Sequence, residues 1–207
     1  LDFKITPDVL IPRPETETLV ETLLLLNSKN PDELPLRLLE IGTGSGAIAV
    51  VAAQEIPNCR VTATDYFLEA LAVARLNAGN HEVSDKINFV KSDMFLELPI
   101  VLYDCIVSNP PYIQTSRLND LMTDVIGFEP RSALDGGNDG LSFYKRIIPG
   151  ALSYLKKGGA IVLEIGETQA KAVTRLFYQE DQYEEIKVIQ DYSGYDRVVS
   201  ARKKIYG

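Results

Sequence analysis

The stretch LLEIGTGSGAIAV, from Leu38 to Val50, decides the fold of this chain. It begins as an apolar strand, passes through a turn that holds Gly42, Gly44 and Gly46, and continues as an alanine-rich helix. Glycine adopts turn conformations that other residues avoid, and it lets the backbone approach a ligand closely. This order predicts the first unit of an open α/β sheet, with a ligand site beyond the carboxyl end of the strand.

Apolar strand-like runs alternate with helical patterns on both sides of this stretch. We predict strands over residues 37–41, 60–65, 87–90, 104–108, 160–165, 185–190 and 197–201. We predict helices over residues 13–26, 46–56, 67–80, 141–159 and 168–180. Pro14 should lie in the first turn of the first helix, and Pro149 should start a new turn or kink the fourth.

Strands separated by helices are typical of a parallel, doubly wound sheet. Only the short DYSGY segment separates the last two strands, which should therefore pair as an antiparallel hairpin. The predicted fold class is a doubly wound, seven-stranded, mostly parallel α/β sheet with this terminal hairpin. Residues 113–139 form the one irregular region, and a loop of this length in a compact domain is usually functional or mobile.

Composition argues against several classes of function. The 207 residues carry a formal net charge of −8, so duplex nucleic acid is a poor partner. We see no apolar run long enough for a membrane helix and no secretion signal, and we expect a cytoplasmic protein. Cys59 and Cys105 fit buried thiols in a reducing compartment. His81 is the only histidine, so the sequence offers no histidine–cysteine cluster and we expect no metal.

Acidic residues near the glycine turn indicate a ligand that contains adenosine. Asp65 ends the second predicted strand, where a carboxylate can accept hydrogen bonds from ribose hydroxyls. Glu40 precedes the turn and could hold an ammonium group. Asp93 follows the third predicted strand and could accept from the adenine amino group, with Met94 or Phe95 packed on the ring.

Other interpretations of these residues stay open. Gly42, Gly44 and Ala47 also satisfy the dinucleotide-binding pattern G-x-G-x-x-G/A. The turn could instead join strand and helix without any ligand. Asp93 could be a helix N-cap or a turn residue.

A second polar segment, SNPPYIQ from Ser108 to Gln114, follows the fourth predicted strand. Asn109 and Pro110 each precede a proline and are biased toward extended geometry, which can aim their carbonyl groups into the crevice. With the side-chain oxygen of Asn109, these acceptors can hold both hydrogens of a planar –NH₂ group. Tyr112 offers a ring face to stack on that group. We interpret Asn109, Pro110, Pro111 and Tyr112 as a clamp for a conjugated nitrogen that becomes alkylated; the alternative is a cis-proline corner with a capping asparagine.

The glycine turn, the acidic end of the second strand and NPPY together resemble the class I S-adenosylmethionine-dependent methyltransferases. More narrowly, VLIPRPETE, NPPYI, FEPRSALDGGNDGL and VLEIG are similar to segments of the HemK-type protein-(glutamine-N5) methyltransferases of peptide chain release factors. The resemblance implies S-adenosylmethionine as cofactor, S-adenosylhomocysteine as product and the glutamine of a Gly-Gly-Gln motif as methyl acceptor. It also implies a sheet order of 3-2-1-4-5-7-6.

The resemblance carries roles to residues of this chain. Asn109, Pro110 and Tyr112 would be catalytic, and together with Pro111 they would bind the substrate glutamine. Arg13, Glu15 and Thr16 would lie near the crevice, although Glu15 and Thr16 could equally provide helix-terminal charge and capping. The cofactor would be bound by Glu40, Gly42, Thr43, Gly44, Ser45, Gly46, Asp65, Asp93, Met94 and Asn109.

Members of this family usually carry a helical domain ahead of the segment that corresponds to TPDVLIPRPE. We therefore expect residues 1–207 to form a single methyltransferase domain without that helical substrate-recognition domain. The expected partner is a release factor, and the oligomeric state stays open. Rival functions are a DNA or RNA methyltransferase acting on adenine N6 or guanine N2, a nucleotide-dependent oxidoreductase, and a non-catalytic binding module.

Overall fold

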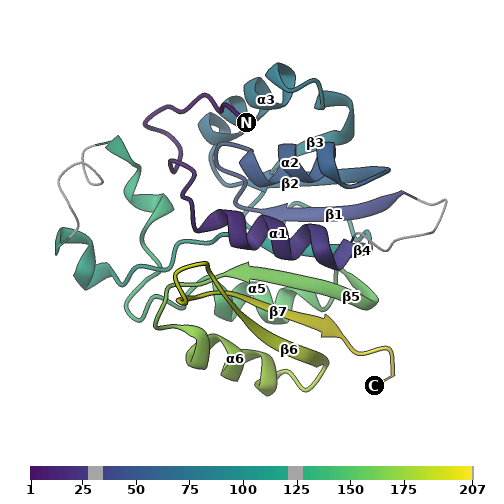
Figure 1. The fold of residues 1–207 in the computed structure, drawn as a ribbon, viewed down its shortest axis with the longest axis vertical. Helices are drawn as coiled ribbons and strands as arrows, with labels where there is room; N and C mark the ends of the chain where they lie inside the picture. Colours follow the sequence, from purple (N-terminus) through teal and green to yellow (C-terminus); the bar gives the residue numbers. More distant parts are fainter. Residues whose placement is uncertain (28–34, 121–127, 207) are drawn as a thin grey trace.

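The computed structural model describes residues 1–27, 35–120 and 128–206. One seven-stranded sheet organises the molecule (Figure 1). Its strand order is β3-β2-β1-β4-β5-β7-β6, as the resemblance implies. Pairing is parallel from β3 through β5, and β7 pairs antiparallel with both β5 and β6. The strands are β1 (Leu36–Ile41), β2 (Cys59–Asp65), β3 (Ile87–Lys91), β4 (Tyr103–Ser108), β5 (Leu155–Glu164), β6 (Tyr183–Gln190) and β7 (Asp196–Lys203). The predicted fold class is confirmed.

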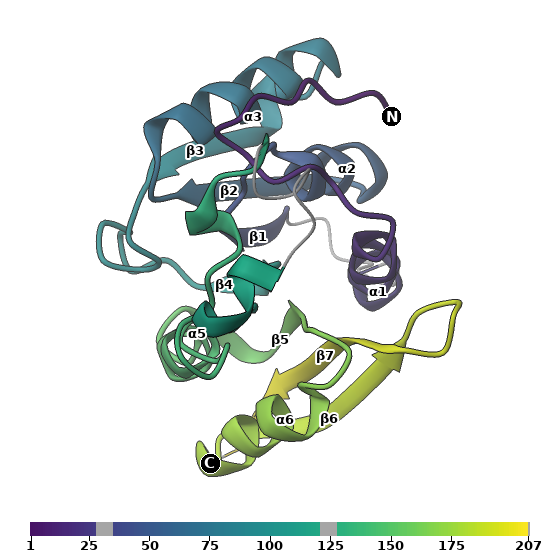
Figure 2. The same cartoon turned by 90° about the vertical axis from the view of Figure 1, so that its left-hand side faces the viewer.

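Helices cover both faces of the sheet, and Figure 2 shows α1 and α5 on opposite sides of it. They are α1 (Thr16–Asn27), α2 (Ala47–Glu55), α3 (Leu68–Asn80), α5 (Tyr144–Ala151) and α6 (Ala170–Gln179). Short 3₁₀ turns lie at Ser84–Lys86, Thr115–Asp120 and Arg131–Ala133. Within the described part of the chain, no helix is long and apolar enough to cross a membrane.

Two apolar cores flank the sheet because successive strand residues point to opposite faces. Leu38 of β1 belongs to the core that contains residues of α1 and α2. Leu39, the next residue, belongs to the core that contains residues of α5 and α6. Both side chains are fully buried, which explains why β1 is a continuous apolar run and not an alternating one.

The fourth predicted helix is wrong over its second half. We expected it to extend to residue 159, but α5 ends at Ala151, two residues beyond Pro149, and β5 already begins at Leu155. Leu155 pairs with Tyr103 of β4, and the register then shifts so that Ala160 pairs with Cys105. Sheet pairing therefore overrides the helical pattern over this segment, and Gly158 takes a positive φ of 76° where the register shifts.

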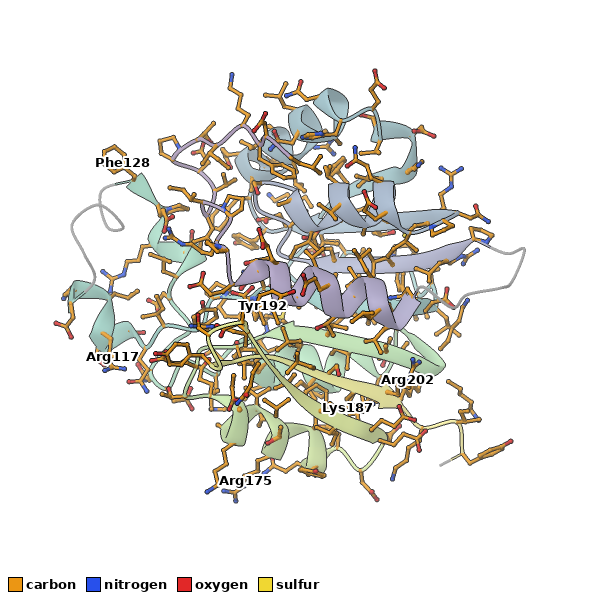
Figure 3. The ribbon with its side chains drawn as sticks, viewed as in Figure 1. Arg117, Phe128, Arg175, Lys187, Tyr192 and Arg202 are labelled. Carbon is orange, nitrogen blue, oxygen red and sulfur yellow. The ribbon has the colours of Figure 1, made fainter. Side chains whose placement is uncertain are left out.

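The hairpin of β6 and β7 reaches α1 through the turn that joins the two strands. The Tyr192 hydroxyl hydrogen-bonds to both carboxylate oxygens of Glu21, at 2.7 and 2.9 Å, and Figure 3 shows Tyr192 beside α1. The antiparallel end of the sheet is thereby joined to α1.

Candidate active site

A cavity of about 550 Å³ lies at the carboxyl ends of β1 to β4. Its walls come from the segments that follow these strands, from residues 8–16, from α5 and from residues 130–135. Parallel strands direct their carboxyl ends to one edge, so the site collects residues that are far apart in sequence. Of the predicted site residues, the cavity is lined by Thr16, Gly42, Thr43, Gly44, Ser45, Asp65, Asp93, Met94, Asn109, Pro110 and Pro111.

The three glycines of the first turn all have positive φ, between 54° and 83°. A Cβ on Gly42 or Gly44 would meet no atom of the described residues within 4 Å, so these two present bare backbone beside open space. A Cβ on Gly46 would lie 3.0 Å from Ala74 of α3. Gly46 therefore lets α2 pack against α3, and unlike the other two it does not line the cavity.

Glu40 is fully buried beneath the glycine turn and does not itself line the cavity. Thr43 Oγ1 donates to its Oε2 at 2.7 Å, whereas Oε1 has no hydrogen-bond partner among the residues that the structure describes. Burial raises the pKa of Glu40 to about 8. Buried carboxyl oxygens without a hydrogen-bond partner are rare. Glu40 Oε1 can therefore accept a hydrogen bond from a ligand group that approaches past Thr43.

Asp65 lines the cavity with its carboxylate already anchored by the backbone. Gly44 N donates to Oδ2 at 2.9 Å and Phe67 N donates to Oδ1 at 3.0 Å. Burial raises the pKa of Asp65, and these backbone bonds oppose that rise. Each carboxylate oxygen can accept more than one hydrogen bond, so Asp65 retains capacity toward a diol in the cavity.

Asp93 and Met94 line the same wall, next to α5. Asp93 Oδ1 forms an ion pair with Arg146 Nη2 at 2.8 Å, which sequence reasoning did not anticipate. Met94 has a backbone φ of +56°, which is uncommon for a residue other than glycine. Ser92 Oγ donates to the Met94 carbonyl at 2.8 Å and holds this conformation in place.

Asn109 is held by a chain of hydrogen bonds that begins at a buried carboxylate. Its Nδ2 donates to Thr16 Oγ1 at 3.2 Å, and Thr16 Oγ1 donates to Glu164 Oε2 at 2.8 Å. The Tyr112 hydroxyl lies 3.5 Å from the other oxygen, Glu164 Oε1. Thr16 is therefore part of the site, whereas Tyr112 turns its hydroxyl to Glu164 and does not line the cavity.

The NPPY corner is packed tightly from behind. Gln169 Nε2 donates to the carbonyls of Tyr112, at 3.0 Å, and Gly140, at 3.1 Å. A Cβ on Gly136 would lie 2.7 Å from Tyr112 Cα, and a Cβ on Gly140 would lie 2.5 Å from the Tyr112 carbonyl oxygen. The segment LDGGNDG thus needs Gly136 and Gly140 because the backbone of NPPY lies directly against them.

Arg13 clamps two walls of the cavity together. Its Nη2 donates to both carboxylate oxygens of Glu129, at 2.8 and 2.7 Å, and Ile11 N donates to Glu129 Oε1 at 3.3 Å. Glu129 is buried, so Arg13 compensates a charge that water cannot reach. Arg13 itself does not line the cavity, and neither does Glu15.

Sequence reasoning missed four supporting residues, which are Glu129, Gly140, Glu164 and Gln169. Three of them lie in EPRSALDGGNDG and VLEIG, which stood out only through the family resemblance. A buried glutamate at the end of an apolar strand was the one local signal for Glu164. Gln169 gave no signal of its own.

Comparisons with known proteins show which family this chain resembles. The family model described as methyltransferase small domain matches residues 16–196. A release factor glutamine methyltransferase of Moorella thermoacetica is 43% identical over 204 residues, which cover 99% of this chain and 71% of the relative. A protein of the same name from Coxiella burnetii is 45% identical over 98% of this chain and 70% of its own length.

Solved structures show the same fold at lower identity. The human Mettl16 catalytic domain, solved with an RNA hairpin, superposes with a TM-score of 0.76 and 19% identity over all of this chain and 76% of its own. A methyltransferase from Pyrococcus furiosus has a TM-score of 0.70 and 22% identity over 99% of this chain and 89% of its own.

Fold, site and family model together define a class I methyltransferase. Identities of 43% and 45% over nearly the whole chain then narrow the class. The chain belongs to the family of release factor glutamine methyltransferases.

Proposed function

We propose that this chain transfers a methyl group from S-adenosylmethionine to the side-chain amide nitrogen of the glutamine in a Gly-Gly-Gln motif of a peptide chain release factor. One observation carries the proposal beyond family membership. Asn109 lines the cavity beside Pro110, and its –NH₂ group is engaged by Thr16. Its amide oxygen is therefore the atom left to accept from a substrate –NH₂.

The residues of the cavity fit the proposed cofactor. Gly42 and Gly44 offer bare backbone beside open space, and Asp65 can accept from ribose hydroxyls. Glu40, whose Oε1 has no partner among the described residues, would ionise when the cofactor's ammonium group approaches and would then provide the compensating negative charge, with Thr43 between Glu40 and the cavity. Asp93 and Met94 would face the adenine ring.

When bound, the cofactor would supply an electrophilic methyl group on a positively charged sulfur. The amide nitrogen would gain this methyl and release a proton to water, and the electron pair of the broken carbon–sulfur bond would stay on sulfur. The chain's own part is positioning. Asn109 and Pro110 provide acceptors for the two amide hydrogens, which orients the nitrogen lone pair and offsets the positive charge that grows on it. Pro110 and Pro111 carry no N–H group that could compete for these acceptors.

A methylation assay with labelled S-adenosylmethionine tests the proposal. We expect label on a release factor and no label on the same factor with its motif glutamine changed to alanine. RNA and duplex DNA should accept none. Label on nucleic acid, or equal label on the unchanged release factor and on its glutamine-to-alanine variant, would overturn the glutamine assignment.

Asn109→Ala removes the acceptor and should lower kcat by roughly 100-fold, the size seen when one group aimed at developing charge is deleted. Asn88→Ala changes an exposed asparagine of β3 and is the matched control. Steady-state kinetics on the release factor measure both variants. An Asn109→Ala enzyme as active as Asn88→Ala would show that the clamp does not operate.

A further inference from the structure

Glu164 has no role in the proposed reaction, yet it stands at the end of a hydrogen-bond chain that reaches the site. It is the last residue of β5 and only 1% exposed. Thr16, the first residue of α1, donates to it at 2.8 Å, and Asn109, just past β4, donates to Thr16 at 3.2 Å. Residues from three segments that are distant in sequence therefore form one series of hydrogen bonds, which ends in the cavity.

The directions of these hydrogen bonds follow from the chemistry of the carboxylate. An ionised carboxylate only accepts hydrogen bonds, so the single hydrogen of the Thr16 hydroxyl must point to Glu164. Thr16 Oγ1 can then offer only lone pairs to Asn109, and lone pairs select the –NH₂ end of the amide. The two ends of an asparagine amide look alike in shape, so the choice between them depends on such partners.

We propose that the Glu164 carboxylate, acting through the Thr16 hydroxyl, fixes which end of the Asn109 amide faces the substrate. Glu164 is thus a positioning residue: it touches neither substrate nor cofactor, but it keeps the Asn109 oxygen directed at the substrate –NH₂. The inference rests on the proposed function, since it presumes that this oxygen receives the glutamine amide.

Protonation of Glu164 would reverse the direction of the hydrogen bonds that join Glu164, Thr16 and Asn109. A neutral carboxyl can donate to Thr16, whose hydrogen is then free to donate to Asn109 Oδ1, and the amide turns its own –NH₂ to the substrate. Two –NH₂ groups cannot hydrogen-bond to each other productively, so substrate binding weakens. Burial raises the pKa of Glu164 to about 7, which places this reversal within the range of ordinary assays.

Several groups face Glu164 and set its ionisation. The Thr16 hydroxyl from α1 and the Tyr112 hydroxyl after β4 stabilise the carboxylate, and so does the positive charge of Arg197 from β7. The negative charge of Glu15 opposes ionisation. The Tyr144 hydroxyl from α5 donates at 2.7 Å to the backbone carbonyl of Glu164 and leaves its carboxylate free.

The first test needs neither cofactor nor substrate. The side-chain ¹⁵N–¹H₂ signals of Asn109, assigned by their loss in Asn109→Ala, should shift with a midpoint near pH 7 as Thr16 changes partner. In Glu164→Gln, which keeps an acceptor for Thr16 but cannot ionise, this titration should vanish. A pH-independent Asn109 signal in the wild type, or an unchanged titration in Glu164→Gln, would overturn the proposal even if glutamine is methylated.

The second test uses kinetics. The kcat/KM of the wild type for the release factor should rise with pH through about 7, and this rise should be absent in Glu164→Gln. Thr16→Val removes the relay and should lower kcat/KM by about tenfold, the size of one hydrogen bond. Thr18→Val, also buried in α1, is the matched control and should retain activity.

The outcomes separate the two proposals. Absence of glutamine methylation in every variant, with a normal Asn109 titration, would reject the proposed substrate and keep the relay. Methylation that is equal in Thr16→Val and Thr18→Val would reject the relay and keep the substrate. The affinity for S-adenosylhomocysteine, measured by calorimetry, should be the same in Thr16→Val and Thr18→Val.

Discussion

Gly42 and Gly140 share a positive φ, near +73° and +71°, but they meet different surroundings. Beside Gly42 there is open space, whereas a Cβ on Gly140 would lie 2.5 Å from the Tyr112 carbonyl oxygen and 2.7 Å from Gln169 Nε2. One glycine leaves room for a ligand, and the other lets two backbone segments touch.

This difference predicts distinct effects of alanine. Gly42→Ala should reduce the free energy of unfolding by about 1 kcal/mol, the cost of a left-handed backbone. Gly140→Ala adds overpacking of roughly 1–3 kcal/mol to the same cost. Urea unfolding checks both, and equal losses in the two variants would contradict the packing argument. Calorimetry should show weaker binding of S-adenosylhomocysteine by Gly42→Ala, because its new methyl group points into the cavity.

Local signals sufficed for the glycine turn but not for the residues behind the corner. Gly42, Asp65 and Asn109 each lie at the end of a strand, and the apolar residues before them in sequence predict that strand. Thr16 and Glu164 are 148 residues apart, and nothing near either of them indicates the other. The hydrogen bonds that orient Asn109 could therefore not be predicted from the sequence and were found only in the structure.

The segments before α1 and around residue 130 form two walls of the cavity, and Arg13 and Glu129 join them across 116 residues of sequence. The Glu129 side chain is 1% exposed, while that of Arg13 is 36% exposed. Both carboxylate oxygens accept charge-assisted hydrogen bonds from the one nitrogen Nη2, and removal of Arg13 leaves a buried carboxylate without its cation.

Arg13→Ala should therefore lower the free energy of unfolding by about 1–3 kcal/mol, the cost of an unsatisfied buried group. The exposed pair of Arg60 and Asp85, 3.9 Å apart, provides the control, and Arg60→Ala should change stability by at most about 0.5 kcal/mol. Double-mutant cycles in urea measure both couplings. A coupling of Arg13 to Glu129 as small as the control would show that the clamp contributes nothing.

Helices and strands were predictable where the apolar residues of a segment follow a helical or strand-like pattern. The predicted bounds of β1 to β4 lie within one residue of those observed, because turn residues or helices flank each apolar run. The start of β5 was missed because Leu155 to Gly159 gain strand structure only by lying next to β4. Neighbouring strands in space, and not local preference, decide such a segment.

The sheet as a whole gathers two buried glutamates at its carboxyl edge. Burial raises the pKa of Glu40 to about 8 and that of Glu164 to about 7, and it also raises the pKa of Asp65. Between the ordinary glutamate pKa of 4.5 and these raised pKa values, the folded protein binds more protons than the unfolded chain. Its stability is therefore highest at the acidic end of this window and falls as the pH rises through it.

Glu40→Gln should flatten this decline, because the variant no longer forces a charge into the core at pH 8. Urea unfolding between pH 5.5 and 8.5 measures the slope for both proteins. Saturating S-adenosylmethionine should also reduce the slope of the wild type if its ammonium group compensates Glu40. An identical slope in Glu40→Gln would show that another group titrates.

The central claim concerns one contact, in which the oxygen of Asn109 accepts from the nitrogen that is methylated. A crystal structure with S-adenosylhomocysteine and a Gly-Gly-Gln peptide measures it directly. We predict that the glutamine side-chain nitrogen lies within about 3.2 Å of Asn109 Oδ1, an ordinary hydrogen-bond distance. A glutamine nitrogen that is bound elsewhere, with Asn109 Oδ1 turned to Thr16, would contradict the account.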